Sequence, residues 1–270
     1  MAGVGKTPIT PQEILEGELY GVLTKAAGEA QPLSVTTIER KIRAAEDRFE
    51  KELQLFFGHR RVVSNPQGRG IPATDYDVAI PALDYDRDWW TDERWGFFAF
   101  PYRPVVSVQG AFFAYPGTNF VAAFQLPEPW LQIDYKFGDA RIVPATGQAI
   151  TAVFNGYILS ILSGGRGLPR SFFLDFTAGL SHDELLTDHA DLLEALRIEV
   201  VLSLFGILTN VRTGGLASQS LSLDGLSRSQ AFGGGKYGPY SGAIELWLQQ
   251  QKAILESWRR AERGPVLMVM

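Results

Sequence analysis

The spacing of apolar residues changes twice along this chain, and this change limits the folds that the chain can adopt. Within residues 35–56, apolar residues recur every three or four positions, which predicts an amphipathic helix. Within residues 130–137, apolar and polar residues alternate strictly, which predicts a strand with one buried face. Helical spacing returns within residues 192–211 and 244–258. We therefore expect an α+β protein in which a β-rich segment separates helical segments.

Helix-start signals and prolines indicate where these segments begin and end. Three pairs of residues have the spacing of a capping box: Thr10 and Glu13, Thr36 and Glu39, and Ser181 and Glu184. Repeated prolines within residues 58–104 interrupt any longer element there. We expect a helical-bundle core with an inserted β-rich subdomain and an extended C-terminal arm. The predicted segments are 8–57 (first core helices), 58–150 (inserted β-rich subdomain), 151–213 (further core helices), 214–242 (Gly/Ser-rich arm) and 243–270 (last helix and apolar tail).

The balance of charge argues against a protein that grips nucleic acid. The chain has 270 residues with 25 Lys and Arg against 30 Asp and Glu, a net charge of -5, and no basic stripe. A protein that binds phosphates tightly is normally basic, at least on one face. Hydrophobic residues make up 46% of the chain, which is enough for a sizeable core.

Other sequence features bear on the compartment. Cys is absent, so the chain has no disulfide, thiolate metal site or Cys nucleophile. This absence fits assembly in a reducing cytoplasm. No apolar stretch reaches the roughly 18 residues that a membrane helix needs, and the N-terminus lacks the apolar region of a signal peptide. We expect no membrane partner.

Signals for catalysis or metal binding are weak. Residues 3–7 (GVGKT) lack the earlier Gly and the preceding strand of a phosphate loop, so we interpret them as a flexible N-terminus. His182 and His189 are two helical turns, about 10 Å, apart, which is too far for one zinc ion. No serine lies in a nucleophile-elbow motif. We expect no catalytic residues, no metal site, no cofactor and no enzymatic activity.

One acidic, aromatic loop provides an alternative function. Its residues are Asp84, Asp86, Asp88, Trp89, Trp90, Asp92, Glu93 and Trp95. Carboxylates beside aromatic rings occur in glycan-cleaving sites, and aromatic rings stack on sugars. A glycan-binding or glycan-cleaving protein is therefore the alternative, with Asp84, Asp86, Asp88, Trp89, Trp90 and Trp95 as its site. The simpler interpretation is a solvated acidic loop, since the run lacks the Gly and distal Glu of a calcium loop.

The least ordinary segment is residues 214–242. It carries almost no charge, alternates small polar with aliphatic residues, and follows a strong helical pattern. Such a segment can lie across a neighbouring subunit or add a strand to its sheet edge. The predicted subunit-interface residues are Leu216, Ser218, Ser220, Leu221, Leu223, Asp224 and Leu226. The alternative is an arm that packs on its own core.

The C-terminus has a related character. Its apolar run would be a liability if exposed on a monomer, so we expect a partner to cover it. The predicted docking residues are Trp258, Pro265, Val266, Leu267, Met268 and Val269. The alternative is a frayed end.

Three motifs resemble those of head–tail adaptor (neck or connector) proteins of tailed double-stranded DNA phages. The first is Ser-x-Ser-x-Asp-Gly-Leu-Ser at residues 220–227, followed by a Gly/Tyr-rich loop at 233–240 and a helix that ends in a basic stretch. The second is Phe-Pro-Tyr-Arg-Pro-Val-Val-Ser-Val at residues 100–108, before an aromatic strand. The third is Glu-Asp-x-Phe-Glu at residues 46–50, within the first long helical pattern.

This resemblance implies a helical core, a ring that is typically dodecameric, and no enzymatic activity. It implies a place in the virion neck, where the ring joins the portal protein to the tail or to a tail-completion protein. DNA would pass through the lumen without sequence-specific binding, and an acidic lumen would let it slide. Another minor virion role, such as a tail-completion protein, is a further alternative. The predicted docking residues of the C-terminus would contact the portal.

Overall fold

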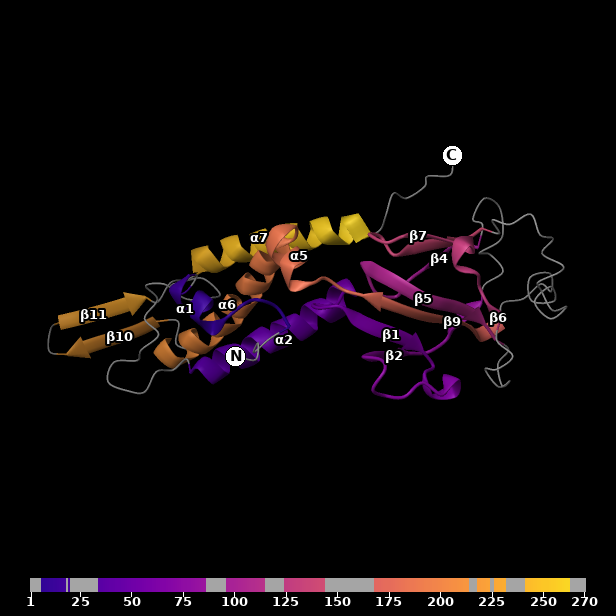
Figure 1. Cartoon of the computed structure of the whole chain (residues 1–270). Helices are drawn as coiled ribbons and strands as arrows, with labels where there is room; N and C mark the ends of the chain where they lie inside the picture. Colours follow the sequence, from indigo (N-terminus) through magenta and orange to yellow (C-terminus); the bar gives the residue numbers. More distant parts are fainter. Residues whose placement is uncertain are drawn as a thin grey trace, which may run out of the picture. The chain divides into compact units, whose positions relative to one another are not determined.

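The structure, a computed structural model, describes residues 6–17, 19, 34–85, 96–114, 124–143, 168–213, 218–223, 226–231 and 241–262 (Figure 1). It is a mixture of helices and sheets, which confirms the α+β prediction. The chain divides into two compact units. The helical unit comprises Met1–Leu53 and Ser181–Met270, and the β-rich unit comprises Gln54–Leu180.

The helical unit is built on long helices that were predicted from apolar spacing. Helix α2 packs against α6, and α6 packs against α7. The helices are α1 (Pro11–Glu16), α2 (Val35–Leu53), α5 (His182–Thr187), α6 (Ala190–Thr213) and α7 (Ser241–Glu262). Their buried apolar residues include Ile14, Ile38, Ile42, Phe49, Leu53, Leu185, Leu192, Leu196, Val200, Leu204 and Ile244.

Two of the three predicted capping boxes are present. Thr10 with Glu13 begins α1, and Ser181 with Glu184 begins α5, each with reciprocal side-chain and backbone hydrogen bonds. The third prediction, Thr36, is wrong. Helix α2 begins at Val35, so Thr36 lies within its first turn, and the hydroxyl of Ser34 accepts a hydrogen bond from the Thr37 amide at 3.2 Å.

The β-rich unit contains two sheets. The larger has strand order β2-β1-β9-β5-β6, with β3 also paired to β9, and the smaller has order β4-β8-β7. The strands are β1 (Arg60–Ser64), β2 (Val78–Ile80), β3 (Leu83–Tyr85), β4 (Phe98–Ala99), β5 (Val105–Phe113), β6 (Phe124–Gln125), β7 (Leu131–Asp134), β8 (Asp139–Ile142) and β9 (Leu168–Ala178). All pairs are antiparallel except β1 with β2.

Aromatic side chains fill the core of the β-rich unit. Phe98 meets Phe172 edge-on at 4.9 Å between ring centroids, and Phe100 meets Phe176 at 4.8 Å. Such edge-on pairs add to the free energy of apolar burial. The buried members of this core are Phe56, Val62, Phe98, Phe100, Val105, Ala111, Phe113, Leu126, Trp130, Ala140, Ile142, Phe172, Leu174, Phe176 and Ala178.

The two ends of the β-rich unit lie side by side and are hydrogen-bonded to each other. The Gly58 amide donates to the Leu180 carbonyl at 2.7 Å, and the Leu180 amide donates to the Phe56 carbonyl at 2.9 Å. Gly179, with φ of +122°, makes this close approach possible, because a Cβ there would lie 2.3 Å from the Gly58 oxygen. The entry and exit of the unit are therefore joined to each other.

Three features differ from the sequence-based expectations. The β-rich unit continues past residue 150 to Leu180, because β9 pairs with β1, β3 and β5 in the larger sheet. The strand predicted for residues 130–137 ends at Asp134, whose side chain accepts hydrogen bonds from the amides of Lys136 and Phe137. In the predicted extended arm, the described residues instead form a hairpin of β10 (Ser218–Leu223) and β11 (Leu226–Ala231).

Candidate functional site

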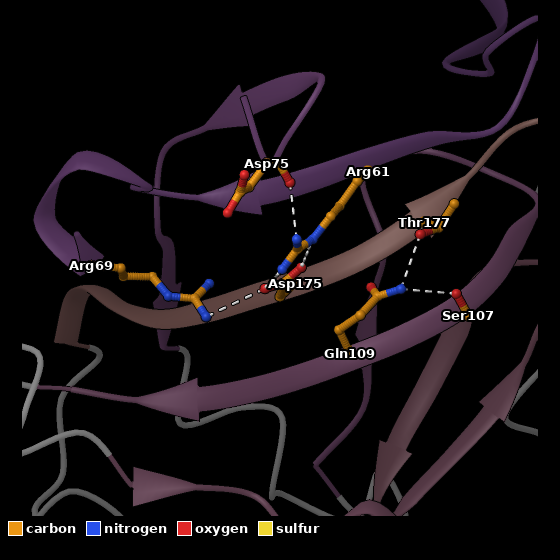
Figure 2. Close-up of polar contacts among 7 residues, drawn as sticks. All are labelled: Arg61, Arg69, Asp75, Ser107, Gln109, Asp175 and Thr177. Carbon is orange, nitrogen blue, oxygen red and sulfur yellow. Dashed lines mark hydrogen bonds and ion pairs between the residues drawn. The ribbon is translucent and has the colours of Figure 1, made fainter. Parts of the chain in front are cut away.

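A cluster of charged residues lies on the sheet face that points away from the aromatic core (Figure 2). Along β9, Phe172, Leu174 and Phe176 face the core, so the alternate residues Asp175 and Thr177 lie on the opposite face. Asp175 nevertheless has only 4% of its surface exposed. A carboxylate so deeply buried requires strong partners.

Two arginines supply those partners. Arg61 on β1 binds Asp175 through two nitrogens, Nε to Oδ1 and Nη2 to Oδ2, both at 3.0 Å. The Nη2 of Arg69 lies 3.5 Å from Oδ2, and its guanidinium carbon lies 4.6 Å from the centroid of the Phe112 ring. Arg69 reaches this position from the short 3-10 helix Gln67–Arg69, between β1 and β2. Figure 2 shows both guanidinium groups directed at Asp175.

The environments of the two arginines differ, and so do their pKa values. The hydrogen bond from Arg61 to Asp175 raises the pKa of Arg61, because it favours the charged form. Burial lowers the pKa of Arg69, although the charge of Asp175 opposes this effect. Both groups remain charged at neutral pH.

A second polar group lies beside this cluster. The amide nitrogen of Gln109 on β5 donates to the hydroxyls of Ser107 and Thr177, both at 3.0 Å. The bond to Thr177 joins β5 to β9 near one of the two register shifts in this pair of strands, whereas the bond to Ser107 lies within β5. The arrangement stabilises the sheet.

The carboxylate of Asp175 is buried and accepts hydrogen bonds from arginine donors, so it is poorly placed to act as a general base.

The acidic, aromatic loop lies almost entirely outside the described residues. Asp86, Asp88, Trp89, Trp90, Asp92, Glu93 and Trp95 belong to the part of the chain that the structure does not describe. Asp84 is described, and its Oδ1 accepts a hydrogen bond from the Arg170 amide at 2.8 Å. Because Arg170 has a positive φ of 51°, this bond supports an irregular position in β9. The described part of the loop therefore has a structural role.

The end of the GVGKT motif is anchored, in contrast to the flexible N-terminus that we predicted. The carboxylate of Glu46 on α2 is fully buried, and it accepts from the Thr7 amide at 2.8 Å and the Thr7 hydroxyl at 2.6 Å. It also accepts from the Lys6 amide at 3.1 Å. The Lys6 ammonium binds Asp47 at 2.5 Å and Glu50 at 2.7 Å. The Glu-Asp-x-Phe-Glu motif thus holds residues 6 and 7 on α2.

Helix α7 is attached to α6 by polar and aromatic contacts. The indole nitrogen of Trp258, a predicted portal-docking residue, donates to Asp191 at 3.0 Å, and its ring meets His189 edge-on at 5.0 Å. Gln251 donates to Glu199 at 2.8 Å. In the structure, Trp258 is therefore half-buried against its own chain. The other predicted docking residues, Pro265, Val266, Leu267, Met268 and Val269, lie outside the described residues.

The predicted subunit-interface residues fall mainly on the hairpin of β10 and β11. The structure describes backbone positions for Ser218, Ser220, Leu221, Leu223 and Leu226 within these strands, whereas Leu216 and Asp224 lie outside the described residues. In the described part of the chain, β10 and β11 pair only with each other. The dipeptide Asp224-Gly225 between the two strands is a typical hairpin signal, and it could have predicted the pairing of β10 with β11 from the sequence.

Similarity to known proteins does not identify the chain. No family model matches it, and a search of curated proteins gave no match.

Among the described residues, no group of three or more His, Cys, Asp or Glu side chains could hold a metal ion. No helix in that same part of the chain is both long and apolar enough to cross a membrane.

Proposed function

We propose that this chain is a non-enzymatic structural protein of a tailed phage, a ring-forming adaptor that joins the portal to the tail. The observation that carries the proposal is the charge-poor hairpin of β10 and β11 between the two long helices α6 and α7. A two-stranded hairpin is only marginally stable in water, so it gains most when another surface covers it. In a ring, each copy must offer two different surfaces to its neighbours.

The rest of the molecule is consistent with this proposal. The packed helices α2, α6 and α7 of the helical unit would provide the frame on which the hairpin is mounted. The buried carboxylate of Asp175 is engaged in ion pairs with Arg61 and Arg69, so this cluster is poorly suited to catalysis. The net charge of -5 suits a conduit through which DNA slides without being held.

The place in the virion can be tested by locating the chain in particles. We expect mass spectrometry of purified tailed particles to detect the full-length chain together with the portal protein. Imaging of particles that carry a tagged chain should place the tag at the neck. Absence of the chain from all tailed particles would contradict the proposal, and a tag at the distal end of the tail would favour the alternative of a tail-completion protein.

A further inference from the structure

The register of the β10–β11 hairpin shows that its two strands carry nearly the same sequence read in opposite directions. Gln219 pairs with Gln230, and Leu223 pairs with Leu226. Serine pairs with serine at two further positions, Ser220 with Ser229 and Ser222 with Ser227. Each strand therefore presents almost the same series of residues along its outer edge.

Both outer edges of the hairpin carry backbone N–H and C=O groups that could hydrogen-bond an added strand. In an antiparallel ladder, alternate residues bond the partner strand, and the N–H and C=O groups of the other residues point away from it. In the described part of the chain, neither β10 nor β11 pairs with a third strand. Arg228 is the one charged residue among the twelve in the two strands, so the edges lack the charges with which proteins usually prevent edge-to-edge pairing.

We propose that β10 of one copy pairs antiparallel with β11 of the next copy, so that the hairpins of a ring form one continuous β-ribbon. This inference rests on the proposed ring. If the added strand repeats the register of the hairpin, Gln219 lies opposite Gln230 of the next copy, and Ser220 lies opposite Ser229 of the next copy. The residue pairs between copies would be the same as those within the hairpin, where they are already accommodated.

Charge and symmetry favour this arrangement over the pairing of identical strands. Antiparallel pairing of β11 with β11 sets outward-pointing residues opposite each other, so Arg228 lies opposite either Arg228 or Gln230 of the other copy. The two arginines are then directly opposite or diagonal neighbours, where like charges repel. In the proposed pairing, Arg228 lies opposite Leu221 of the next copy, as it does within the hairpin. Pairing of β10 with β10 would leave both β11 edges open and would stop at a dimer, whereas pairing of β10 with β11 uses both edges and closes a ring.

The test uses cysteines, because the chain has none of its own. One full-length variant carries Ser220→Cys on β10, and a second carries Ser229→Cys on β11. The two are mixed, allowed to assemble and treated with a mild oxidant, so that only directly opposed cysteines form a disulfide bond. We expect a covalent dimer as the main product of the mixture and none from either variant alone. As a matched control, a mixture of Ser229→Cys with Gln249→Cys, a variant on the exposed surface of α7, should give no dimer.

The outcomes separate this inference from the proposed function. A dimer from either variant alone would show pairing of identical strands and would overturn the inference, as would rings that give no dimer from the mixture. Wherever the chain still forms rings, the proposed function would stand and only the inferred contact between the hairpins would be wrong. If the unmodified chain forms no ring, both the inference and the proposed function fail.

Discussion

At the scale of single residues, the most demanding position in the β-rich unit is Asp175. Its buried carboxylate is compensated by Arg61 and by Arg69, whose side chain is only 7% exposed. Removing one partner of a buried ion pair leaves the other charge uncompensated, which costs far more than the pair itself contributes.

We therefore expect Asp175→Asn to lower the free energy of unfolding by about 3 kcal/mol. Chemical denaturation of the full-length chain, followed by tryptophan fluorescence, measures this change. Glu128→Gln, at an exposed position of the same unit, should have little effect. Equal stability of the two variants would show that the arginines do not depend on Asp175.

Asp139 on β8 provides a prediction about pH. Burial raises the pKa of Asp139; nearby Asp134 also raises it, while Arg103 and Arg141 oppose the shift. Because the pKa is higher in the folded state, the charged carboxylate destabilises the fold at neutral pH. This cost disappears as the pH falls below the ordinary pKa of an aspartate, about 4.

Asp139→Asn should therefore raise the melting temperature at pH 7, with a gain that shrinks as the pH falls through the acidic range. Melting curves of the variant and the original chain between neutral and acidic pH test this. A gain in melting temperature that grows toward low pH would contradict a raised pKa of Asp139 in the folded state.

At the scale of elements, the connection between the ends of the β-rich unit depends on Gly179. A Cβ at this position would meet the Gly58 oxygen at 2.3 Å and the Phe56 oxygen at 3.0 Å, and its φ of +122° disfavours any side chain. Backbone atoms cannot move aside as a flexible side chain can.

We expect Gly179→Ala to destabilise the β-rich unit by about 3 kcal/mol. Gly206→Ala is the control, because its Cβ would meet nothing within 4 Å on an exposed part of α6. In a helix this change should raise stability by up to about 1 kcal/mol. Thermal unfolding of both variants makes the comparison, and a harmless Gly179→Ala would mean that the two chain segments are not so closely joined.

The attachment of residues 6 and 7 to α2 depends on Glu46. Glu46→Gln replaces one carboxylate oxygen, which accepts hydrogen bonds, with an amide nitrogen, which donates them. The new N–H group would then point at an N–H or O–H donor of Thr7 or at the Lys6 amide, and that hydrogen bond would be lost. We expect the free energy of unfolding to fall by about 1–3 kcal/mol. Hydrogen exchange at Thr7 should accelerate, while Glu39→Gln, at a half-exposed position of α2, should leave it unchanged. Unaltered exchange in Glu46→Gln would show that this carboxylate does not hold the segment.

Elements with strong periodicity were predictable, and their long-range partners were not. Helix α6 follows directly from the apolar spacing within residues 192–211, and strand β7 follows from the alternation within residues 130–137, although it ends at Asp134. The place of β9 between β1 and β5 depends on pairing across distant parts of the chain. For the same reason the ion pair of Arg61 and Asp175, 114 residues apart, was missed. A single aspartate within the apolar run Phe-Phe-Leu-Asp-Phe at residues 172–176 was its one sequence signal.

At the scale of the whole molecule, the account depends on self-association. The predicted interface residues lie mainly on the β10–β11 hairpin, whereas Trp258, one of the predicted docking residues, is engaged within its own chain. The hairpin is therefore the part of the proposal with the clearest structural support. Its two similar edges and single charged residue fit repeated head-to-tail contact.

Native mass spectrometry of the purified full-length chain over a range of concentrations tests this claim most directly. We predict one closed assembly, whose mass is a fixed multiple of the monomer mass and does not grow as the concentration rises. A monomer at every concentration, with or without the portal protein, would contradict the account.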